Sequence, residues 1–155
     1  MIIKRSLAIL LLCTVMLSLS SCSHGVVSHV EISEYSSEVY SDSDIQSAIN
    51  EVISNFEEKW PRCTLLTASY IGDDQLESYQ DWADRNDADE VIVILSDFYV
   101  SIFSDSPTMN TGSEYQGWGW ILVRNEGEAW RIVDQGYQNK NQITRLRPFH
   151  SIYWV

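Results

Sequence analysis

The chain has 155 residues, and its 22 acidic side chains outnumber its 10 basic ones, which gives a formal net charge of −12. This length suffices for one domain with a single core and is too short for two. A surface this negative repels phosphate backbones, so nucleic acid is not an expected partner.

The first 21 residues have the pattern of an export signal. Lys4 and Arg5 precede an almost unbroken apolar run from Leu7 to Leu19, as in the charged and apolar regions of a signal peptide. The run is shorter than the ~20 residues that a spanning helix needs. An ordinary signal peptide cut nearby and an uncleaved anchor helix are the alternatives. Without residues 1–21, 8 basic and 22 acidic residues remain, a formal charge of −14.

The leader ends in Leu19-Ser20-Ser21-Cys22. This sequence resembles the lipobox of bacterial lipoproteins, in which cleavage makes the cysteine the new N-terminus and its thiol carries the lipid. The resemblance implies lipidation of Cys22 and a place on the extracytoplasmic face of the cell membrane. Two acyl chains anchor a protein far better than one, since each buried CH₂ adds about 0.8 kcal/mol.

The next segment, residues 22–42, is predicted to be the lipidated N-terminus and a flexible tether. It is rich in Ser, Glu and Tyr and has no strong hydrophobic period. About 20 flexible residues span roughly 25 Å, enough to lift a domain off the lipid headgroups. His24 and His29 lie here and are weak candidates for metal ligands, so no metal is expected.

A helix is predicted next, from about residue 44 to 60. Ser43 and Gln46 have the spacing of a capping box, and Pro61 stops the helix. Apolar residues recur at intervals of three and four: Ile45, Ala48, Ile49, Val52, Ile53, Phe56 and Trp60. Residues 64–71 are β-prone. A shorter helix is predicted from Asp73, with an apolar stripe of Leu76, Tyr79 and Ala83 and with Trp82 as a further member.

The strongest strand signal runs from Glu90 to Phe103. Its continuous apolar start indicates burial on both faces, and its later part alternates. Residues 104–113 form a loop, and further strands are expected at 115–124 and 129–134, joined by a turn. We therefore predict an α+β domain over residues 43–137, with helices on one face of a bent antiparallel sheet of about four strands.

Residues 43–137 resemble a family of uncharacterised small lipoproteins from anaerobic Gram-positive bacteria. The matching pieces are residues 63–65, 88–93, 118–124 and 130–137. The order of the elements is also similar to the NTF2-like, cystatin-like cone, whose concavity often holds a ligand. Neither resemblance implies a catalytic residue. The chain departs from the family in its basic C-terminal tail, residues 138–155, which is either an extra strand or an irregular end.

Several residue types that carry chemistry in other proteins have ordinary explanations here. Cys63 is interpreted as a buried core residue, because a nucleophilic cysteine needs a nearby histidine and only His150 follows it. Asp73 and Asp74 are interpreted as charges favoured by the dipole at a helix N-terminus. The acidic residues that follow, up to Glu90, lack the loop pattern of a calcium site and are interpreted as a solvated face. The sequence contains no phosphate loop, dinucleotide fingerprint or zinc spacing, so no cofactor is expected.

Aromatic residues near the end of the domain are the candidates for ligand binding. Trp118 and Trp120 are two apart on a predicted strand and so share one face, with Tyr115 and Trp130 close in sequence. The alternative is that these rings are core. Asp97 and Asp134 fall within predicted strands, which disfavour Asp. They are candidates for a polar or acid–base pair in the cavity, or for salt bridges to Arg124 or Arg131.

These patterns favour a non-catalytic ligand- or protein-binding domain at the cell surface, with a peptide, a glycan or an envelope protein as partner. The alternative is a small envelope enzyme of NTF2-like type that uses an Asp in an aromatic-lined cavity. A structural accessory to a membrane complex is the third hypothesis.

Overall fold

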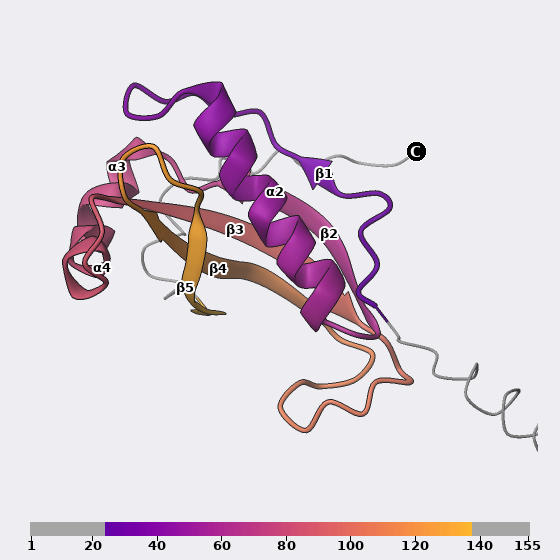
Figure 1. Ribbon diagram of the computed structural model, residues 1–155. Helices are drawn as coiled ribbons and strands as arrows, with labels where there is room; N and C mark the ends of the chain where they lie inside the picture. The colour runs from indigo at the N-terminus through magenta and orange to yellow at the C-terminus, as the bar shows by residue number, and fades with distance from the viewer. Residues whose placement is uncertain (1–23, 138–155) are drawn as a thin grey trace, which may run out of the picture.

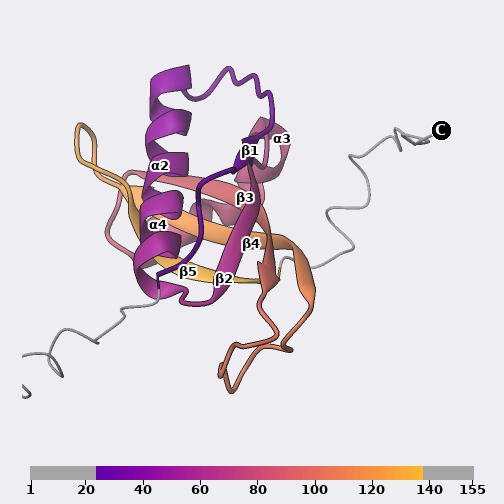
Figure 2. The same ribbon diagram turned by 90° about the vertical axis from the view of Figure 1, so that its right-hand side faces the viewer.

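A long helix crosses one face of a five-stranded sheet (Figures 1 and 2). The computed structural model describes residues 24–137. The predicted leader, the lipidation site at Cys22 and the basic tail at 138–155 lie outside the described residues. None of the helices within residues 24–137 has the length and apolar character needed to cross a membrane.

Helix α2, Asp42–Lys59, forms where the 3.6-residue period predicts a helix. Its cap differs from the prediction, because Ser41 rather than Ser43 is the N-cap. The Ser41 side chain accepts a hydrogen bond from the Asp44 N–H, and the Asp44 carboxylate accepts one from the Ser41 N–H. Asp can take the place of Glu or Gln in this reciprocal pair. The helix therefore begins about half a turn earlier than predicted.

The sheet has the strand order β1-β2-β3-β4-β5. The four long strands are antiparallel neighbours: β2 (Cys63–Tyr70), β3 (Glu90–Val100), β4 (Glu114–Arg124) and β5 (Arg131–Tyr137). The two-residue strand β1, Glu31–Ile32, pairs parallel with β2. The α+β class is thus confirmed, but the sheet is mixed and five-stranded rather than wholly antiparallel with about four strands.

The fifth strand comes from the segment predicted to be a tether. Residues 24–41 lie along the domain: Val26 bridges to Thr64, and β1 extends the edge of β2. The Gly25 N–H donates to the Glu57 carbonyl at the end of α2. The sequence of this segment predicts a tether because it has no hydrophobic period. Its contacts with the domain are made largely by backbone groups, and no side-chain pattern reveals backbone pairing.

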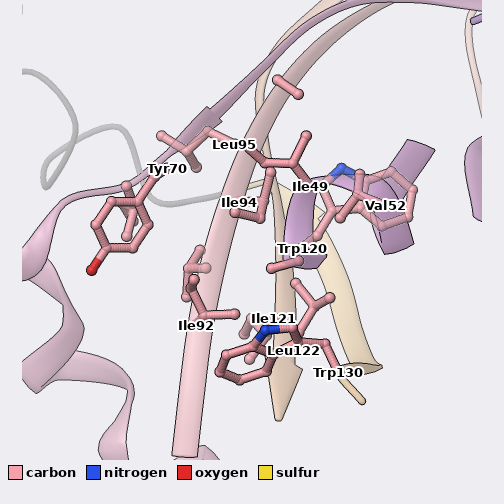
Figure 3. Packing of buried hydrophobic residues seen from close by; sticks show 14 of the residues in the cluster. Ile49, Val52, Tyr70, Ile92, Ile94, Leu95, Trp120, Ile121, Leu122 and Trp130 are labelled. Carbon is pink, nitrogen blue, oxygen red and sulfur yellow. The ribbon is translucent and has the colours of Figure 1, made fainter. Parts of the chain in front are cut away.

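The centre of β3 is buried on both faces, as its continuous apolar start predicts. Ile92 and Ile94 lie with Trp120 beneath Ile49 and Val52 of α2 (Figure 3). The alternating residues Val91 and Val93 are equally buried. Helices α3 (Asp73–Leu76) and α4 (Gln80–Arg85), joined by a 3₁₀ turn at Glu77–Tyr79, contact β3 and contribute the buried Leu76, Tyr79 and Ala83.

Candidate functional site

A groove of about 620 Å³ lies where α2 ends, between that end and the loop that joins β3 to β4. Its lining combines aromatic and apolar side chains with amides, hydroxyls and single charges. The lining residues are Asn55, Lys59, Trp60, Pro61, Cys63, Ser104, Asp105, Ser106, Pro107, Thr108, Met109, Trp118 and Gln135. Its size is within the usual range of small-ligand sites.

Trp118 is the only one of the six predicted ligand-binding residues that lines this groove. Its ring is half-buried and packs edge-on against Trp60 and Tyr137, with centroid separations of 5.7 and 5.2 Å. Its indole N–H is buried and has no hydrogen-bond partner within the part of the chain that the structure describes. A buried donor left unpaired costs about 1–3 kcal/mol, so the fold is not optimised for stability at this position.

Trp120 and Tyr115 belong to the core. Trp120 shares the face of Trp118, as predicted, but it is wholly buried against Phe56 and Trp60 and donates to the Ser96 hydroxyl at 2.8 Å. Tyr115 is buried too, stacked on Phe98, and its hydroxyl accepts from the Asn110 N–H. Both act as supports behind the groove rather than as its wall.

Trp130 lies at the opposite end of α2. It is buried, and its indole N–H donates to the Asp44 carbonyl at 3.1 Å. The Arg124 guanidinium lies over its ring at 4.1 Å and bridges the carboxylates of Asp44 and Glu90. The prediction that Arg124 would pair with Asp97 or Asp134 is therefore wrong: its two partners come from the first turn of α2 and the start of β3.

Asp97 holds a bend in the sheet. Both neighbouring strands shift register beside it, and Gly117, with a φ of +66°, supplies the extra residue on β4. The Asp97 carboxylate accepts from the Gly117 N–H at 2.8 Å, and its own N–H donates to the Thr67 hydroxyl. A β-bulge that leaves backbone donors unpaired explains an Asp within a strand.

Asp134 is exposed and pairs in register with Ile121 on β4. Trp120 faces α2, and side chains alternate along a strand, so Ile121 and Asp134 face away from α2. Asp97 likewise alternates with Ser96 and Phe98, which both contact rings beneath α2. The structure does not bring Asp97 or Asp134 into the groove, and it does not pair them with each other.

A second polar cluster fixes the segment before α2. Asp73 accepts hydrogen bonds from the Ser37 hydroxyl, the Glu38 N–H and the Tyr70 hydroxyl. These bonds, that of Ser37 foremost, lower the pKa of Asp73. The sequence suggested only a favourable helix-dipole charge for this residue. The Tyr40 hydroxyl donates to the Val91 carbonyl at 2.8 Å, and burial, with the Glu90 charge, raises the pKa of Tyr40 to about 12.

Cys63 is buried, and burial raises the pKa of its thiol. A raised pKa disfavours the thiolate that nucleophilic catalysis needs. Within residues 24–137 no cluster of His, Cys, Asp and Glu side chains could hold a metal ion. The groove thus offers aromatic surface and hydrogen-bonding groups.

The sequence indicates few of the residues that line the groove. Trp60 belongs to the apolar stripe of the predicted helix, and residues 104–109 belong to a predicted loop with no other signal. Gln135 lies opposite Trp120 on β5 and so shares the face of the tryptophans. The Trp-Pro pair at the end of the helix and a proline-containing loop were visible signals, but nothing local indicates that they meet.

Comparison of the chain with models of known protein families, with curated proteins and with solved structures finds no match.

Proposed function

We propose that the chain is an extracytoplasmic lipoprotein, anchored to the cell membrane through acylated Cys22, whose domain is a non-catalytic binding module. Its N-terminal sequence supports the anchor through the charged start, the short apolar run and the lipobox-like Leu-Ser-Ser-Cys. The groove at the end of α2 supports the binding role. The partner is a molecule of the cell envelope, and nucleic acid is disfavoured by the acidic surface.

The ligand that suits the groove best is an uncharged saccharide, such as a short glycan. The observation that carries this proposal is Trp118: its half-buried ring lies in the wall of the open groove, and its indole N–H is buried without a partner among the described residues. Saccharides present flat C–H surfaces to aromatic rings and hydroxyls to amides. The amides here are those of Asn55 and Gln135, and the loop adds the hydroxyls of Ser104, Ser106 and Thr108.

The cone of the NTF2-like fold is the architecture we propose for this domain. One long helix packs on a sheet whose long antiparallel strands bend at Asp97. In that type of fold the concave side next to the helix is where ligands are held, and the groove beside Trp60 and Trp118 occupies the corresponding place.

Binding is favoured over catalysis by the groups that the groove contains. Hydrolysis of a glycosidic bond commonly uses two carboxylates that flank it. Among the lining residues that the structure describes, Asp105 is the one carboxylate, and Asp97 binds the Gly117 N–H in the sheet instead. An envelope enzyme that uses an Asp in this cavity would therefore lack the second group.

A glycan array with the detergent-solubilised full chain tests the ligand class. We expect binding to one class of saccharide, lost in Trp118→Ala and retained in Trp82→Ala. Trp82 is a suitable control because it is also half-buried but lies on α4, away from the groove. If the full chain binds no saccharide, or if both variants bind equally well, the saccharide proposal is wrong.

The anchor has its own test. In cells fed a clickable fatty acid, the wild-type chain should be labelled and should partition into detergent, whereas Cys22→Ala should be unlabelled and remain uncut or be released. Labelling that persists in Cys22→Ala would refute acylation at this position.

A further inference from the structure

Two large apolar side chains stand exposed directly after β3. Ile102 is 64% exposed and Phe103 is 72% exposed. Their backbone is held in place: the Arg62 side chain donates to the Phe103 carbonyl at 2.8 Å, and the Ser101 N–H donates to the Arg62 carbonyl at 2.9 Å. The pair is therefore presented to solvent by a fixed turn, and an exposed apolar pair of this kind commonly marks a contact surface.

The described chain begins at the same end of the molecule (Figure 1). The Val26 N–H donates to the Cys63 carbonyl, next to Arg62, and the Leu65 N–H donates to the Val26 carbonyl. Val26 is itself 46% exposed. Gly25 is fixed still more closely, because a Cβ at this position would lie 2.4 Å from the Phe56 carbonyl oxygen. The domain thus holds its chain from residue 25 onward.

Only two residues, Ser23 and His24, separate Cys22 from Gly25. At 3.3–3.6 Å per residue, the three steps from Cys22 to Gly25 reach at most about 11 Å. A tether of about 20 residues would have left the domain free to turn, whereas this short link leaves little freedom. A lipid on Cys22 therefore keeps Gly25, at the end of the domain that also carries Val26, Ile102 and Phe103, within about 11 Å of the lipidated residue.

We propose that this end, the anchor face formed by Val26, Ile102 and Phe103, rests on the bilayer and inserts the Phe103 and Ile102 side chains among the lipid headgroups. This inference rests on the anchor at Cys22 but not on the saccharide. Arg62 and Lys59 lie at the same end, and their positive charges favour anionic headgroups. The negative charges of Glu57, Glu58 and Asp105 offset this electrostatic attraction. The apolar pair therefore provides the attraction to the bilayer. The acidic residues that begin α2 and α3 point away from the lipid.

The groove shares the loop that carries the anchor face, since residues 104–109 follow Phe103 directly. A ligand in the groove would thus be bound close to the membrane surface rather than at a distance from it. This placement suits an envelope molecule that is itself attached to, or assembled at, the membrane.

The test places a polarity-sensitive dye on the acylated full chain in vesicles of phosphatidylethanolamine and phosphatidylglycerol. In a Cys63→Ala background the dye is attached to Phe103→Cys or, as a matched control, to Val39→Cys. Val39 is exposed to a similar degree, 60%, but precedes α2, whose 18 residues span about 27 Å. With nitroxide-labelled lipid in the vesicles, we expect the dye on Phe103→Cys to lose most of its emission and that on Val39→Cys to keep it.

Equal quenching of the two dyes, or none, would overturn the proposal. Circular dichroism confirms that both labelled variants are folded, and flotation of the vesicles confirms that the chain is attached. A chain that fails to float has no anchor and overturns this inference and the localisation together. Loss of saccharide binding without loss of quenching would count against the groove alone.

Discussion

The two ends of α2 are built on the same helix and the same strand β4, yet they differ in how completely their polar groups are paired. At the N-terminal end, Arg124 joins Asp44 to Glu90 and covers Trp130. At the C-terminal end, the Trp118 indole N–H has no partner among the described residues, and a groove of about 620 Å³ is open. The N-terminal end, here called the closed end, has its polar groups paired. The C-terminal end, the open end, leaves aromatic surface for a partner.

The largest expected effect lies between the two ends. Trp120→Ala removes a wholly buried ring that contacts Phe56 and Trp60, and we expect a loss of about 3–5 kcal/mol in the free energy of unfolding. Urea denaturation followed by circular dichroism measures it. A loss below about 1 kcal/mol would mean that Trp120 is not a core residue.

The closed end is tested by Arg124→Met. This change keeps much of the side-chain volume but leaves Asp44 and Glu90 without their cation, and we expect a loss of about 2–3 kcal/mol. Arg85→Met is the matched control, since Arg85 lies on the exposed surface of α4, where it pairs with Asp81 and covers the Trp82 ring, and it should cost less than about 1 kcal/mol. Equal losses for the two variants would show that the closed end adds no special stability.

The segment before α2 is tested by Asp73→Asn. The pKa of Asp73 is lowered in the folded state, so its contribution to stability is present above the unfolded-state value of about 3.9 and is lost as the pH falls through the folded-state pKa. We expect the variant to lose about 1 kcal/mol at pH 7 and to show a flatter decline in acid. Thermal melts from pH 7 to pH 2.5, with the exposed Asp74→Asn as control, measure both. An unchanged acid limb in Asp73→Asn would contradict the assignment.

The smallest effect on stability is expected at the open end. Trp118→Phe removes an N–H that has no partner within residues 24–137 and keeps a smaller aromatic ring, so the free energy of unfolding should change by less than about 1 kcal/mol. Saccharide affinity should nevertheless fall, which isothermal titration calorimetry measures. A large loss of stability would place Trp118 with Trp120 in the core and leave the groove without its aromatic wall.

The sequence predicted the elements well because their hydrophobic periods are strong and local. The helix that contains Ile45 and Phe56 and the doubly buried start of β3 were both expected from such patterns. Ser41 was missed as the N-cap because Ser43 has a similar pattern two residues later. β1 was missed because two exposed residues that pair by backbone bonds leave no trace in hydrophobicity.

The candidate site was predicted much less completely. Tryptophans close together in sequence were expected to share one cavity, but Trp118 on β4 and Trp130, which directly precedes β5, lie at opposite ends of α2. The position of Asp97 within a strand was correctly noted as unusual, and its cause is a bulge around Gly117 rather than chemistry. Trp60 and the loop at residues 104–109 come together through long-range packing, which no local sequence pattern encodes.

Hydrogen exchange tests most directly whether the C-terminal end of α2, which carries the groove and the anchor face, is the end that lies against the membrane. The acylated full chain on vesicles would be compared with Cys22→Ala in solution. We predict slower exchange on the vesicles at residues 24–26, 59–63 and 101–113, with residues 35–44 and 73–76 unchanged. Slower exchange at the closed end, or no difference between the two ends, would contradict the account.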